Sequence, residues 1–188
     1  MKPILPIILC FIYSLSLAQQ HSGAYPDAIP VPDKKIELRS TYNGKPMIVW
    51  REVEMKEPHL ILNLAKRLVE DVKNNGLAAY NNPQDSLTQP QTATINQVLF
   101  SEMYPDTLNK ILMLEQWDLD EQKGQMVVQL IALAPAYTSE GKYYPLFWNK
   151  YETVAPLLKE VKYSTDKQAK TMLDVFEQRL FTSFIIKK

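Results

Sequence analysis

The segment from Ile111 to Trp148 constrains the fold most, because its residue pattern is typical of neighbouring antiparallel strands. Apolar and polar residues alternate imperfectly through Ile111–Leu119, and Glu115 interrupts the otherwise apolar face. The polar run Asp120–Gly124 predicts a turn, since its glycine can adopt a positive φ angle. The second arm, Met126–Leu133, is almost wholly apolar, which predicts a strand covered on both faces. The segment therefore predicts a hairpin at the centre of a sheet.

Local signals place the strands around this hairpin. Pro135 has no backbone N–H for a ladder hydrogen bond, so we expect the second arm to end there. Phe147–Trp148 is expected to form the next strand. Pro46–Met55 alternates with period two and predicts an earlier strand, whereas Asn81–Thr92 is polar, contains two prolines and predicts a loop.

Apolar residues at helical spacing predict the helices that cover this sheet. In Pro58–Asn75 a leucine or valine recurs every fourth residue, proline stands at the first position, and Gly76 suits a left-handed C-terminal cap. Three further helices are expected at Thr94–Met103 with Thr94 as its cap, at Glu152–Val161, and at Gln168–Phe184. The fold class is therefore α+β, a single domain with an antiparallel sheet, a central hairpin and about three to four covering helices.

The first residues indicate export. Residues 1–18 combine a positive start, a short apolar run and small residues before a cut after Ala18, which predicts a secretory signal peptide. The only cysteine, Cys10, lies within this segment, so the mature chain would enter an oxidising compartment without disulfides. Residues 19–45 are rich in proline and small residues and predict an extended arm, with partner binding as one possible role. Residues 46–188 form the expected domain.

Composition excludes several function classes. The chain has 21 lysines and arginines against 21 acidic residues and lacks a basic stripe, which argues against a nucleic-acid partner. After the signal peptide no apolar segment is long enough to span a membrane. Only His21 and His59 could serve as a histidine base, and phosphate-binding and dinucleotide-binding motifs are missing. We therefore expect no catalytic residue, metal site or cofactor.

Two acidic patterns leave weaker alternatives. Asp118-x-Asp120-x-Gln122 is similar to the start of a calcium loop, but the glycine falls one place late, which favours a simple turn. Glu52 and Glu54 could supply the acid pair of a hydrolase. The preferred interpretation of these glutamates is a solvated strand edge paired with lysines.

Aromatic residues remain as candidates for function. Trp50, Trp117 and Trp148 fall on expected strands and suit the core, a docking patch, or the lining of a small-ligand pocket. The C-terminal segment Leu180–Ile186 is so apolar that it must pack on its own domain or on another chain. The residues we select as candidates for a partner interface or for structural packing are Trp50, Arg51, Trp117, Tyr144, Phe147, Trp148, Arg179, Phe181 and Phe184.

Four segments, in this order, carry a family resemblance: Val49–Met55, Leu114–Pro135, Pro145–Leu158 and Leu173–Lys187. Together they resemble the GldN/PorN family, a component of the type IX secretion and gliding machinery of Bacteroidota. The resemblance covers most of the chain from Ile48 onward.

The resemblance implies a non-enzymatic periplasmic assembly subunit. Such a protein would dock with an outer-membrane lipoprotein, build a ring with it as a homo-oligomer, and meet the periplasmic part of an inner-membrane motor protein. The family offers no catalytic residues to carry over. A periplasmic small-ligand-binding protein that uses the tryptophans is the alternative from another functional class.

Overall fold

The computed structural model describes residues 29–30, 45–83, 87–101, 108–163 and 169–187. The expected signal peptide lies outside these residues, as does most of the expected arm. Within them, no helix is both long enough and apolar enough to cross a membrane. The elements are β1 (Ile29–Pro30), β2 (Met47–Glu54), α2 (Pro58–Asn75), α3 (Thr92–Ser101), β3 (Lys110–Asp120), β4 (Gln125–Ser139), β5 (Lys142–Pro145), β6 (Asn149–Lys150), α4 (Tyr151–Glu160), α5 (Met172–Glu177) and β7 (Thr182–Lys187).

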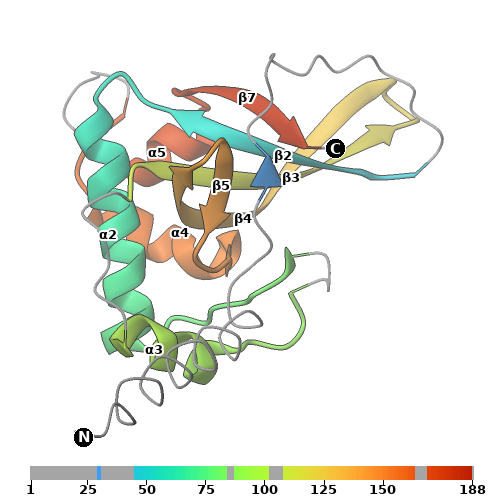
Figure 1. Ribbon diagram of the computed structural model, residues 1–188. Helices are drawn as coiled ribbons and strands as arrows, with labels where there is room; N and C mark the ends of the chain where they lie inside the picture. Colours follow the sequence, from blue (N-terminus) through green and yellow to red (C-terminus); the bar gives the residue numbers. More distant parts are fainter. Residues whose placement is uncertain (1–28, 31–44, 84–86, 102–107, 164–168, 188) are drawn as a thin grey trace, which may run out of the picture.

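One antiparallel sheet organises the fold and confirms the α+β prediction (Figure 1). Its strands lie in the order β1-β5-β4-β3-β2-β7, and β6 also pairs with β4. The predicted hairpin is at its centre, because β3 and β4 pair along the whole of β3. Their register shifts once: Leu114 lies opposite Ala132 and Glu115 lies opposite Leu130, so Ile131 is an extra residue in β4.

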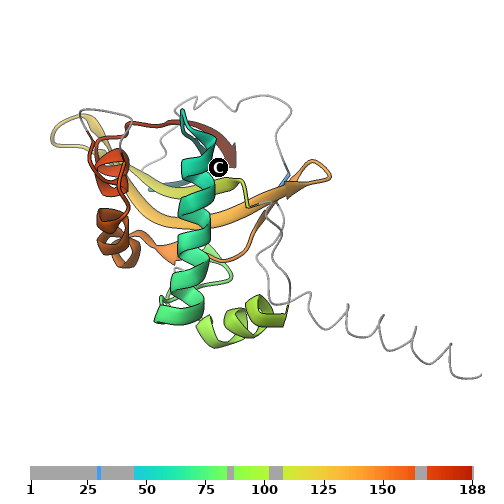
Figure 2. The same cartoon turned by 90° about the vertical axis from the view of Figure 1, so that its left-hand side faces the viewer.

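The sheet separates two hydrophobic clusters. On one face, α2, α4 and α5 pack against alternate residues of the central strands, which include Ile111 and Met113 (Figure 2). On the other face the intervening residues Leu112 and Leu114 meet Trp148 and Tyr143. Both faces of the middle of the sheet are therefore buried, whereas the partial alternation of the first arm is typical of a strand with one polar face.

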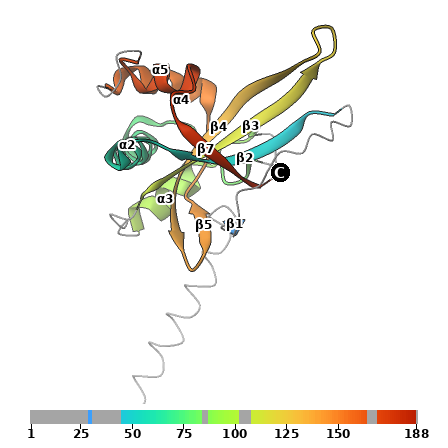
Figure 3. The same ribbon diagram turned by 90° about the horizontal axis from the view of Figure 1, so that it is seen from above.

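The outer part of the β3–β4 hairpin extends beyond the helices (Figure 3). We call residues Gln116–Gln129 the projecting hairpin. The prediction that Met126–Leu133 is covered on both faces is wrong for its first half, since Met126 is 44% exposed and Val127 51% exposed. Burial begins only at Ala132, because the helices reach no further along the strand.

The predicted end of β4 is also wrong. Pro135 lies inside β4 opposite Ile111, and its carbonyl accepts a hydrogen bond of 2.9 Å from the backbone N–H of Leu146, on the other side of the strand. In an antiparallel strand the N and O of one residue point to the same side, so the missing N–H of this proline faces away from the β3 ladder. Phe147–Trp148 is not a full strand, although Trp148 forms an isolated bridge with Tyr80.

The helix predicted at Pro58–Asn75 is confirmed, and its cap Gly76 has φ +69°. The helix α4 agrees with the predicted Glu152–Val161 to within one residue at each end. The helix α3 begins at Thr92, so the expected cap Thr94 lies inside it. The side chain of Thr92 instead accepts a 3.0 Å hydrogen bond from the backbone N–H of Ala79.

The long helix predicted at Gln168–Phe184 is wrong. The helix α5 ends at Glu177, Arg179 adopts a positive φ of +52°, and the chain continues as β7, antiparallel to β2. A capping box between Thr171 and Asp174 starts α5. Pairing with the edge of β2 prevails over helical spacing because a strand satisfies that edge and buries Ile185 and Ile186.

Candidate docking surface

The most exposed large apolar side chains of the described residues lie where the sheet leaves the helices. They are Ile48 on β2 and Met126 and Val127 on β4, and Ile48 is 40% exposed. Ile48 lies opposite Gln116, and Val127 lies opposite Asp118. Apolar area on an uncovered hairpin is typical of a surface that another protein covers.

A buried carboxylate anchors the base of this hairpin. Glu115 has no exposed area, although it carries a carboxylate. Arg179 donates to one of its oxygens at 2.7 Å, and the indole N–H of Trp117 donates to the other at 2.8 Å. The guanidinium of Arg51 lies 3.8 Å from that second oxygen and donates to the hydroxyl and carbonyl of Ser183 at 2.9 and 3.2 Å.

We call Arg51, Glu115, Trp117 and Arg179 the arginine cluster. It joins β2, β3 and the turn before β7, and it unites three candidates that sequence analysis selected separately. Two guanidinium groups share one carboxylate, so the cluster carries a net positive charge, and the side chain of Arg179 is 45% exposed. The cluster holds the strands in register beneath the projecting hairpin and presents one accessible cation beside it.

A second buried carboxylate lies on the opposite face. Glu52 is 2% exposed and accepts hydrogen bonds from the amine of Lys110 and the hydroxyl of Tyr143. The interpretation of Glu52 as a solvated strand edge is therefore wrong, because β2 lies between β3 and β7, although its pairing with a lysine is confirmed. Burial, and then the hydrogen bond to Glu52, raise the pKa of Tyr143 above its ordinary value.

The tryptophans do not line a common pocket. Trp50 and Trp148 are buried and in edge-to-face contact, with ring centroids 4.9 Å apart. Trp117 is half-buried and lies on the other face of the sheet, where its ring is 5.9 Å from the guanidinium carbon of Arg51. A small-ligand pocket built from all three rings has no support in this geometry.

The remaining candidates take structural positions. Phe147 is fully buried in the cluster beneath the helices. Tyr144 is half-buried and stacks on Tyr137 across the β4–β5 pair, with ring centroids 5.1 Å apart. The half-buried rings of the C-terminal segment pack on their own domain, with Phe181 5.3 Å from Phe176 and Phe184 opposite Glu52 on β2.

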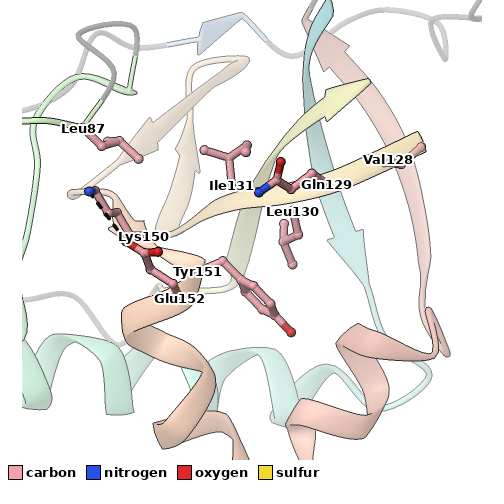
Figure 4. Close-up of a pocket in the computed structure, with 8 residues that line it drawn as sticks. All are labelled: Leu87, Val128, Gln129, Leu130, Ile131, Lys150, Tyr151 and Glu152. Carbon is pink, nitrogen blue, oxygen red and sulfur yellow. Dashed lines mark ion pairs between the residues drawn. The ribbon is translucent and has the colours of Figure 1, made fainter. Parts of the chain in front are cut away.

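A groove that the sequence pattern did not reveal runs beside β4 (Figure 4). It has a volume of about 530 Å³ and lies between Val128–Ile131 on one side and Lys150–Glu152 with Leu87 on the other. The ring of Tyr151 forms part of its wall, and its buried hydroxyl has no hydrogen-bond partner among the described residues. Burial, and then the charge of Glu177, raise the pKa of Tyr151 to about 12. The almost unbroken apolar run of this strand is the one sequence feature related to the groove, and it predicted a covered strand instead.

The acidic turn Asp120–Gly124 and His59 are the remaining candidates from the sequence for a metal site or a catalytic base. The carboxylate of Asp120 accepts backbone hydrogen bonds from Gln122 and Lys123, both at 3.1 Å, which confirms the predicted turn. In the described part of the chain no three potential ligands gather around a common metal position. His59 lies exposed at the start of α2, with its ring 3.2 Å from the carboxylate of Glu57.

Comparison with protein families gives a match over most of the chain. The sequence model of the family described as gliding motility associated protein GldN matches residues 46–188, which is most of the chain. No curated protein matches it. The matched region contains β2 through β7, the arginine cluster and the projecting hairpin. The chain therefore belongs to the GldN family of gliding motility associated proteins.

Proposed function

We propose that the protein is a non-enzymatic assembly subunit of the apparatus for gliding motility and type IX protein secretion. The observation that carries the proposal is the match of the GldN family to residues 46–188. In this role the protein is exported to the periplasm by its signal peptide. There it docks with an outer-membrane lipoprotein, and a ring of such subunits meets the periplasmic part of an inner-membrane motor protein.

The structure supports a docking role through its apolar end. Ile48, Met126 and Val127 are uncharged and exposed on strands that the helices leave uncovered. The register places Ile48 and Val127 on one face of the sheet and Met126 on the other. The accessible guanidinium of Arg179 lies at the base of the hairpin, where it binds Glu115 on the same face of the sheet as Met126. Apolar residues beside an arginine are the usual composition of a binding hot spot, and a partner with a carboxylate could pair with this cation.

The two buried carboxylates, Glu115 and Glu52, bind side chains from other strands and turns, which fits a structural role. Each carboxylate accepts a hydrogen bond on both oxygens, from the Arg179 guanidinium and the Trp117 indole at Glu115, and from the Lys110 amine and the Tyr143 hydroxyl at Glu52. The donor Arg179 joins Glu115 on β3 to the turn before β7. Glu52, Lys110 and Tyr143 line an open hollow of about 460 Å³, but both oxygens of Glu52 already accept a hydrogen bond there. A general acid or base would instead need a carboxylate that is free to exchange a proton with a substrate in such a space.

Purification from envelopes tests this proposal. The protein should co-purify with a fatty-acylated outer-membrane lipoprotein, and deletion of its gene should abolish both gliding and secretion. Replacing both Glu52 and Glu54 by glutamine should leave motility intact in any variant that still folds. Recovery of the protein alone, or a deletion strain that glides and secretes normally, would count against it.

A further inference from the structure

The strand β4 has a free edge along the projecting hairpin. Its inner edge pairs with β3 from Gln125 to Ala136, but its outer edge meets β6 only at Ala132 and Leu133, and β5 only from Ala136 onward. From Gln125 to Ile131, no described residue pairs with the outer edge. Every second residue of this seven-residue segment therefore presents its backbone N–H and C=O to the outer edge without a strand partner in the described chain.

This edge has no charged residue or proline, and its one irregularity is the bulge at Ile131, at the end of the segment. Exposed edges in natural proteins usually carry lysine, proline or another charge that disfavours association. The segment Gln125–Ile131 contains none of these, and five of its residues are apolar. The groove beside Val128–Ile131 also leaves space next to the strand, since its far wall is formed by Leu87 and Lys150–Glu152 (Figure 4).

The residues of this edge are compatible with antiparallel pairing of two copies of the segment Gln125–Ile131. If two copies align antiparallel about Val128, Met126 of each faces Leu130 of the other, and Val127 faces Gln129. Residues 126, 128 and 130 lie on one side of the sheet, since they pair with Leu119, Trp117 and Glu115 of β3. The apolar row of one copy would thus continue into the apolar row of the next, with no charge opposed.

We propose that the free edge of β4, Gln125–Ile131, is a self-association site at which a second copy of the chain adds its own β4 antiparallel. The contact is isologous, with Val128 on the two-fold axis. It ends at Ile131, because β6 occupies the edge beyond that residue. Backbone hydrogen bonds supply the attraction, and the apolar row fixes the register. The pairing requires only two copies of this chain. Its test is therefore independent of the proposed role in the gliding apparatus.

Charge substitutions at the axis test this pairing. Lysine at position 128 would lie directly opposite its own copy, so Val128→Lys should weaken dimerisation at least about tenfold, and Val128→Glu should do the same. An equimolar mixture of the two variants should dimerise again, because each lysine then meets a glutamate. Ile48→Lys, at an exposed site on β2, is the control and should leave dimerisation unchanged.

Sedimentation velocity of the full chain, over protein concentrations from about 1 μM to 1 mM, measures these outcomes. Circular dichroism confirms that each variant folds. If the variants at 128 fail to fold, Val127→Lys with Gln129→Lys replaces them, because both positions are exposed and face each other across the pair. A wild-type chain that stays monomeric throughout would overturn the proposal, even if a strand of another envelope protein occupied the edge. Dimers that tolerate lysine at 128, or at 127 and 129, would overturn it too.

Discussion

At the scale of single residues, two buried glutamates hold the sheet together. Glu115 and Glu52 lie on adjacent strands and face opposite sides of the sheet. Each would be costly to bury alone, and each is stabilised by donors from distant parts of the chain. Sequence analysis could identify Glu115 as an interruption of an apolar face. It could not identify the partner Arg179, because 64 positions separate the two and one sequence does not show which distant residues meet.

Replacing Glu115 by glutamine should destabilise the protein. The substitution leaves Arg179 and Arg51 without their shared anion while it preserves the shape of the side chain. Because both arginines retain some access to water, we expect the free energy of unfolding to fall by only about 1–3 kcal/mol. Urea denaturation measures this, with Glu121→Gln in the exposed turn as the control. Equal midpoints for the two variants would show that the cluster contributes little to stability.

Ionisation of Tyr151 should account for part of the loss of folding stability at alkaline pH. Its hydroxyl lacks a described partner, so Tyr151→Phe should change stability at neutral pH by less than about 0.5 kcal/mol. Its pKa is about 12 in the folded protein against an ordinary value near 10. A raised folded pKa gives stability that is complete below pH ~10 and is lost as the pH rises toward 12.

The phenylalanine variant should therefore lose less stability than the wild type between about pH 10 and 12. Denaturant unfolding at stepped pH values measures the two slopes. Identical slopes would mean that Tyr151 titrates alike in the folded and unfolded chains.

At the scale of elements, local signals predicted the helix α2 but not the strand β7. Pro58, the fourfold apolar spacing and Gly76 all lie within or beside α2, so its bounds could be read directly. The apolar residues of α5 happen to continue at helical spacing to Phe184. What ends the helix is the unpaired edge of β2, which lies more than 120 residues earlier in the chain. Such non-local pairing leaves no local pattern.

The strand β7 should contribute to stability through its packed face. Phe184 is half-buried opposite Glu52, so Phe184→Ala should lower the free energy of unfolding by about 1–3 kcal/mol, less than the 3–5 kcal/mol of a fully buried phenylalanine. Thermal unfolding followed by circular dichroism measures the change. Thr182→Ala, at an exposed position of the same strand, is the control and should change little. An unchanged melting temperature for the phenylalanine variant would contradict this role of β7.

At the scale of the whole molecule, the chain is a covered sheet with one uncovered end. The fold class and the central hairpin could be predicted because periodicity is a local property. How far the helices reach along β4 depends on tertiary packing, so the exposure of Met126 and Val127 could not be read from their apolar character. This uncovered end, in a member of the GldN family, is the basis for an assembly role.

Site-specific photo-crosslinking in living cells tests this account most directly. A photoreactive residue in place of Met126 on the projecting hairpin should form adducts with another subunit, whether a second copy or an envelope partner. The same residue in place of Glu70, exposed on α2, should form few or none. Adducts confined to position 126 are the predicted result. No adducts at 126, or equal labelling at 70, would contradict the claim that this end of the sheet is covered by other subunits.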